Sequence, residues 1–114
     1  MNTKKKNDIL IYPGCVLYDK LHENWLLVMA RSIQIDAWIC FMIEDGRIRQ
    51  FFVSDGDLTM PRIDIYEVYE PQNASDWILD ERLNAVKRRE VNAAAIMKEF
   101  FQSAMALKYC NLPD

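Results

Sequence analysis

Residues 38–53 read WICFMIEDGRIRQFFV, and this stretch decides the fold. Two apolar runs of strand length flank the dipeptide Asp45-Gly46. Asp-Gly between such runs is the strongest short-range signal for a β-hairpin, because a type I′ turn needs a positive φ at both central residues. The sequence therefore predicts an antiparallel hairpin with a two-residue loop.

The position of the loop determines the register of the two strands. Glu44 then lies opposite Arg47, which places a favourable ion pair beside the turn. Counting outward pairs Ile43 with Ile48, Phe41 with Gln50, Cys40 with Phe51, Ile39 with Phe52 and Trp38 with Val53. Both faces of this hairpin are largely apolar, whereas a sheet with one solvated face alternates apolar and polar residues. We therefore expect other strands to cover one face and a helix to cover the other.

Strand signals continue on both sides of the hairpin. Residues 15–18 follow a Pro-Gly turn, and residues 25–30 form a continuous apolar run. A second Asp-Gly, Asp55-Gly56, predicts a third strand, so that an antiparallel meander covers about residues 37–60. Residues 63–70 carry acidic side chains at intervals, which is typical of an edge strand that uses charge against unwanted pairing.

The chain after Asn73 has a helical period. A polar stripe with a spacing of about 3.6 residues is formed by Glu81, Asn84, Arg88, Asn92, Glu99, Gln102 and Ser103. The sequence predicts one helix over residues 75–109, which Asn111 and Pro113 end. The whole chain is then a single α+β domain of 114 residues, with a β region over residues 8–70. We expect a small curved antiparallel sheet or an SH3-like, partly open barrel of about five or six strands, followed by one long C-terminal helix.

Composition excludes several classes of protein. The chain is 51% hydrophobic and 27% charged, a globular balance, and it has no apolar run of the roughly 18 residues that a membrane span needs. No apolar segment of secretory-signal type follows the basic N-terminus. The three cysteines, Cys15, Cys40 and Cys110, lack any Cys-x-x-Cys spacing, so we expect neither a metal site nor another cofactor. Reduced thiols indicate a cytoplasmic protein.

Catalytic motifs are missing from the sequence. No glycine-rich phosphate loop and no Gly-x-Ser-x-Gly elbow is present, so we do not expect an enzyme. The single histidine, His22, lies in a polar stretch that reads as a turn, and the Asp55 and Asp57 pair flanks a turn glycine. A small enzyme that uses His22 or the Asp55/Asp57 pair is the third hypothesis.

Charge separates the two leading hypotheses for function. The net charge is −3, and residues 36–70 hold eight acidic residues against three arginines. A surface that follows a phosphate backbone needs the opposite balance, so a nucleic-acid-associated small β-barrel is the second hypothesis. The first is a small acidic, non-catalytic protein-interaction protein, such as an inhibitor, an immunity-type protein or an adaptor. Its expected acidic face, which would dock on a basic surface of a partner protein, consists of Asp55, Asp57, Asp64 and Glu67.

The distal half of the expected helix suggests a second interface. A helix of roughly 35 residues is about 50 Å long, more than the 20–25 Å width of a small barrel, so its end would overhang. That end is apolar around most of its circumference, and a soluble monomer rarely exposes such a patch. The sequence therefore predicts a homodimer through Met97, Phe100, Phe101, Ala104, Met105 and Leu107.

Overall fold

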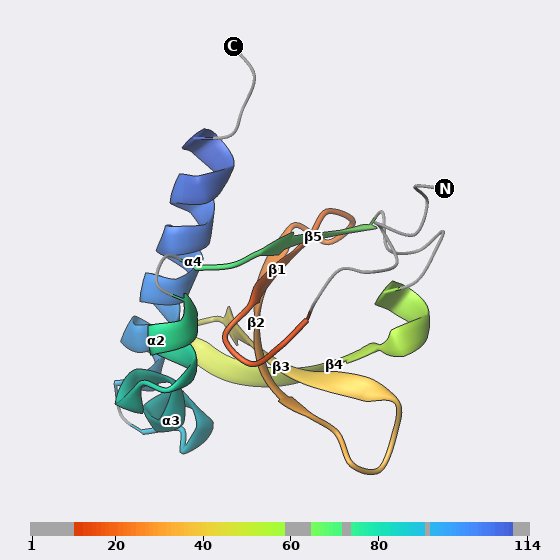
Figure 1. The fold of residues 1–114 in the computed structure, drawn as a ribbon, viewed down its shortest axis with the longest axis horizontal. Coiled ribbons are helices and arrows are strands. Elements are labelled where there is room, and N and C mark those ends of the chain that lie inside the picture. Colours follow the sequence, from red (N-terminus) through yellow and green to blue (C-terminus); the bar gives the residue numbers. More distant parts are fainter. Residues whose placement is uncertain (1–10, 59–64, 72–73, 91, 111–114) are drawn as a thin grey trace.

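A computed structural model describes residues 11–58, 65–71, 74–90 and 92–110. Its strands are β1 (Val16–Asp19), β2 (Asn24–Arg31), β3 (Ala37–Glu44), β4 (Arg47–Ser54) and β5 (Tyr66–Tyr69). They form one antiparallel sheet in the order β4-β3-β2-β1-β5. A 3-10 helix, η1 (Asp55–Leu58), follows β4, and the helices α2 (Ala74–Ile78), α3 (Glu81–Lys87) and α4 (Ala93–Cys110) complete the α+β fold. Figure 1 shows the three α-helices gathered on one side of a bent, open sheet.

The β3–β4 hairpin has the register that the Asp-Gly turn predicts. Glu44 pairs with Arg47, and the pairing continues without a shift to Ala37 and Ser54. Asp45 and Gly46 have φ values of 54° and 76°, as a type I′ loop requires. The local sequence was sufficient here because the turn alone sets the pairing.

The bend of the sheet has a structural cause in the pairing of β2 with β3. Their register shifts between Val28 and Ala30, which leaves one extra residue on β2. Such a bulge bends the strand and increases its right-handed twist. The bent sheet encloses a concave face on the side away from the helices.

Both faces of the sheet are apolar and both are covered, as the hairpin pattern predicts. On the helix side, the buried side chains of the sheet and of α3 and α4 form one cluster: Val16, Leu27, Met29, Phe41, Leu83, Val86, Ala93, Met97, Phe100, Phe101 and Ala104. On the concave side, strand residues pack against one another: Cys15, Leu17, Leu26, Val28, Cys40 and Val53. Ile11, Tyr12 and Leu58 from the flanking segments pack against this second cluster.

The expected third strand of the meander is not found among the described residues, and its last residues, 59 and 60, lie outside them. The segment after Ser54 is the 3-10 helix η1, and the next strand, β5, pairs with β1 instead of β4. Ser54 Oγ accepts a hydrogen bond from Asp57 N at 3.3 Å, so Ser-Asp-Gly-Asp here acts as a helix-starting turn. β5 lies at the edge of the sheet, as its acidic pattern predicts, although residues 63 and 64 lie outside the described part of the chain.

The single long helix is also wrong, because the chain folds into three helices. Asp80 caps the N-terminus of α3 by accepting a hydrogen bond from Arg82 N at 2.9 Å. At the other end, Arg89 has a φ of 55°, and Arg89 N and Glu90 N bond to Val86 O and Ala85 O. This is a Schellman motif, which usually places glycine where Arg89 stands. Because the sequence has Arg89 instead of glycine at this position, the end of α3 could not be predicted from it.

Of the helices in the described part of the chain, none combines the length and the apolar character that a membrane span requires.

We predict that Gly46→Val destabilises the protein by about 1–3 kcal/mol, because a β-branched residue is strained at positive φ. A Cβ at this position would meet no atom within 4 Å, so the loss would be a backbone effect alone. Urea denaturation measures it. Gly56→Ala is the control, since Gly56 is not among the positive-φ glycines. Equal midpoints for Gly46→Val and the wild type would contradict the type I′ loop.

Candidate functional site

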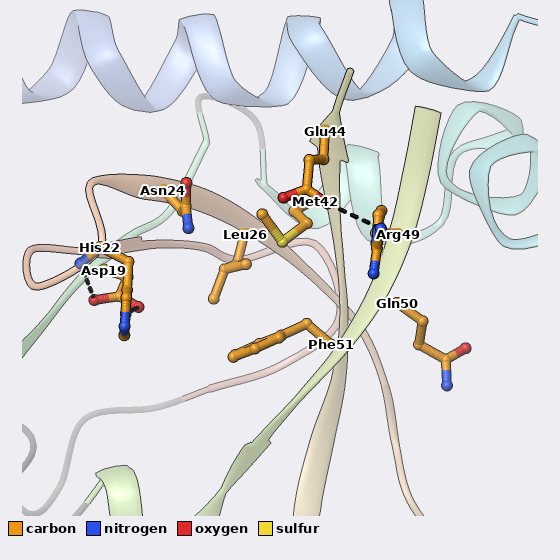
Figure 2. Close-up of a pocket in the computed structure, with 9 residues that line it drawn as sticks. All are labelled: Asp19, His22, Asn24, Leu26, Met42, Glu44, Arg49, Gln50 and Phe51. Carbon is orange, nitrogen blue, oxygen red and sulfur yellow. Dashed lines mark hydrogen bonds and ion pairs between the residues drawn. The ribbon is translucent and has the colours of Figure 1, made fainter. Parts of the chain in front are cut away.

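A pocket of about 270 Å³ opens at one end of the concave face. It lies between the β1–β2 turn and the start of β4, and its walls come from four strands. Its lining residues, shown in Figure 2, are Asp19, His22, Asn24, Leu26, Met42, Glu44, Arg49, Gln50 and Phe51. Leu26, Met42 and Phe51 form an apolar floor, and most of the other residues make a polar rim.

Asp19 holds the β1–β2 turn and the histidine within it. It is the one buried charged residue among the described residues, with 3% of its surface exposed. Its Oδ1 accepts hydrogen bonds from Leu21 N at 2.9 Å and His22 N at 3.1 Å, the arrangement of an Asx turn. Its Oδ2 lies 2.8 Å from Nδ1 of His22, whose side chain is 63% exposed. The buried carboxylate thus orients an accessible imidazole.

A second charged pair faces the pocket from the β3–β4 hairpin. Arg49 Nη1 lies 3.0 Å from Glu44 Oε1; the Arg49 side chain is 64% exposed and that of Glu44 is 49% exposed. Met42 and Arg49 are partners in the ladder, so they share one face of the sheet. The pocket therefore has an oriented imidazole at one end and a balanced ion pair at the other (Figure 2).

The ionisable groups that line this pocket are two carboxylates, one imidazole and one guanidinium. None of its nine lining residues carries a hydroxyl or a thiol. Cys15 and Cys40 lie in the core, where burial raises the pKa of their thiols to about 11 and about 12. Within the described residues, no three His, Cys, Asp or Glu side chains are grouped so as to hold a metal ion.

The described residues of the expected acidic face come from two elements. Asp55 and Asp57 lie in η1, Glu67 lies in β5, and Asp64 is outside the described residues. Both Asp55 carboxylate oxygens accept hydrogen bonds from Arg31, at 2.7 Å each, and this pairing holds the pKa of Asp55 below its usual value. Glu67 accepts a hydrogen bond from the Tyr69 hydroxyl at 2.8 Å. The charge of Asp55 is thus already balanced within the chain.

The residues of the expected helix interface lie mostly in the protein's own core. Met97, Phe100 and Ala104 are at most 1% exposed, and Phe101 is 9% exposed. Phe100 packs edge-on against Trp77 with ring centroids 4.1 Å apart, and Phe101 lies 6.5 Å from Trp25. Of the six residues, Met105 is exposed, and the side chain of Leu107 is outside the described part.

The homodimer was predicted because these apolar residues were expected to be exposed, and their burial removes that basis. The break at Arg89 lets α3 lie against α4, and the sheet covers α4 from the other side, so the apolar residues need no second chain.

Sequence reasoning missed the outer edge of β4. Phe51 and Phe52 are 40% and 46% exposed, although their apolar pattern predicts core positions. The missing third strand explains the difference, because β4 is the end strand and no described strand pairs with its outer side. The unpaired side of β4 adjoins the pocket through Arg49 and Phe51.

No protein-family model, no curated protein and no solved structure matches this chain.

We predict that Asp19→Ala destabilises the protein by about 2 kcal/mol, because two backbone N–H groups and one imidazole lose their acceptor. Asp19→Asn should recover more than half of this loss, since its amide oxygen can still accept from the turn. Urea denaturation of both variants at pH 7 measures the difference. An Asp19→Ala protein as stable as the wild type would contradict a supporting role for Asp19.

Proposed function

We propose that this chain is a non-catalytic protein-interaction protein, of the inhibitor, immunity-type or adaptor kind, that binds an extended segment of another protein along β4. The observation that carries the proposal is an eight-residue end strand with two exposed phenylalanines. Natural proteins usually protect such an edge, because it offers a template for another strand. A partner that adds a strand gains main-chain hydrogen bonds and covers the exposed rings.

The hydrogen-bonding groups at this edge follow from the ladder. Asp55 N donates to Asp36 O at 2.9 Å, so residues 36 and 55 form a hydrogen-bonded pair. In an antiparallel ladder such pairs alternate with non-hydrogen-bonded pairs. The N–H and C=O groups of Ile48, Gln50 and Phe52 therefore point away from β3. These are the groups that a partner strand would use.

The distribution of arginines favours a protein partner over nucleic acid. Arg31, Arg49, Arg82 and Arg88 each lie within 4 Å of a carboxylate, at distances from 2.6 to 3.5 Å. Cations that are already paired release few counterions from a phosphate backbone, so they add little affinity for nucleic acid. A nucleic-acid-associated barrel remains the alternative, and a gel shift at low salt tests it.

The proposal also includes the partner surface, the oligomeric state, the location and the fold family. A basic surface of the partner would dock on the expected acidic residues. One of them, Asp55, already forms an ion pair with Arg31. A homodimer through the distal helix would rest on Met105, which is 37% exposed. A cytoplasmic location agrees with Cys15 and Cys40 forming no disulfide within the described part of the chain. The order of the five strands, with η1 before the last one, is compatible with an SH3-like layout, which stays a prediction.

We predict that Gln50→Pro weakens binding of the partner at least about tenfold, because proline removes an outward N–H and its ring hinders strand addition. The β3–β4 ladder keeps its own bonds, so the fold should survive. Gln50→Ala is the matched control, since it removes the same side chain and its contact with Arg89 but keeps the N–H.

The measurement compares proteins captured from the native host by tagged wild type, Gln50→Ala and Gln50→Pro. A stoichiometric partner should be retained by the first two and lost with the third, whose circular dichroism should match the wild type. A partner held equally by all three would contradict binding along β4.

A further inference from the structure

The pocket lies where the side chains of a strand added to β4 would enter. Phe51 pairs with Cys40, a residue of the concave cluster, so Phe51 and Arg49 both face the concave side. The Gln50 side chain extends away from the pocket floor in Figure 2, as expected for the opposite face. In strand addition, main-chain bonds give affinity, and pockets for alternate side chains give specificity. The pocket is therefore placed to select one side chain of the partner.

The size of the pocket limits its occupant. Sites for drug-sized molecules and cofactors usually enclose about 300–1,000 Å³. At about 270 Å³, this pocket falls just below that range. It suits one ring-bearing side chain better than a nucleotide cofactor.

The floor of the pocket favours an aromatic occupant. Phe51 offers an exposed ring, and aromatic pairs gain more than the burial of their surface alone. Met42 adds a thioether, which makes favourable contacts with ring edges. Leu26 is almost fully buried and closes the bottom. An aliphatic side chain would use only part of these contacts.

The hydrogen-bonding groups at the rim indicate which polar group the occupant carries. An ionised carboxylate can only accept hydrogen bonds, so the 2.8 Å contact with Asp19 places the proton of neutral His22 on Nδ1. Nε2 is then an acceptor. Glu44 contributes further acceptor oxygens, and its ion pair with Arg49 leaves lone pairs free. The rim thus offers acceptors from His22 and Glu44 beside donors from Arg49 and Asn24, and a ring that carries a hydroxyl can both donate and accept there.

We propose that this pocket binds a tyrosine side chain of the partner, with its ring on Phe51 and Met42 and its hydroxyl donating to Nε2 of His22. The assignment rests on the proposed function for its biological meaning. Phenylalanine would leave the rim acceptors without a donor, whereas the tyrosine hydroxyl matches them. Asp19 is a positioning residue, because both of its carboxylate oxygens are engaged with the β1–β2 turn and with His22.

The test uses p-cresol and toluene, which are the side chains of tyrosine and phenylalanine without the backbone. Each is titrated into ¹⁵N-labelled protein at pH 8. We expect p-cresol to shift the amide signals of the lining residues and to bind about five- to tenfold more tightly than toluene, the factor expected for one hydrogen bond. His22→Ala should reduce this preference to less than twofold. Lys20→Ala, an exposed position in the same turn outside the pocket, should preserve it.

Three results would overturn the assignment. These are no p-cresol shifts at the pocket, equal affinity for p-cresol and toluene, or a preference that survives His22→Ala. The outcome is independent of the edge, because p-cresol and toluene have no backbone and add no strand to β4. If p-cresol binds through His22 while Gln50→Pro releases no protein, the interaction along β4 fails and the aromatic-hydroxyl pocket stands. The reverse pattern overturns the pocket alone.

Discussion

A sheet that is apolar on both faces must be covered on both, and the rest of this structure depends on that constraint. On one side, α4 supplies Met97 and Phe100, and the fold-back at Arg89 brings α3 beside it. On the other side, the sheet covers itself by bending at the bulge between Val28 and Ala30. Neither solution works alone, because each protects only one set of side chains from water.

The same constraint explains where the surface is left open. The helices cover one face and the bend encloses the other, but neither reaches the outer side of β4, where Phe51 and Phe52 stay exposed. At the end of the concave face, the turn held by Asp19 leaves a pocket in place of a packed core. The open edge and the pocket share Arg49 and Phe51, so one binding event can use both.

The sequence predicted the features that local residues control. The Asp45-Gly46 register is correct because a two-residue turn sets it without help from the rest of the chain. Asp55-Gly56 was wrongly predicted to form a hairpin turn, because Ser54 can also start a 3-10 turn. Which of the two forms depends on whether another strand pairs with β4. The helix break had no glycine to reveal it. The Asp19–His22 pair stood in the sequence at i, i+3, but only the fold shows that Asp19 is buried and that a pocket adjoins it.

The central claim is that the outer side of β4 is an unpaired strand edge in the free protein. Amide hydrogen exchange along β4, followed by NMR, tests it most directly, because the inward N–H groups of Arg49, Phe51 and Val53 are bonded to β3 and should be protected. The outward amides of Ile48, Gln50 and Phe52 should exchange at least about a hundredfold faster. Uniform protection along the strand would mean that another segment or a second copy already covers the edge, and it would contradict the account.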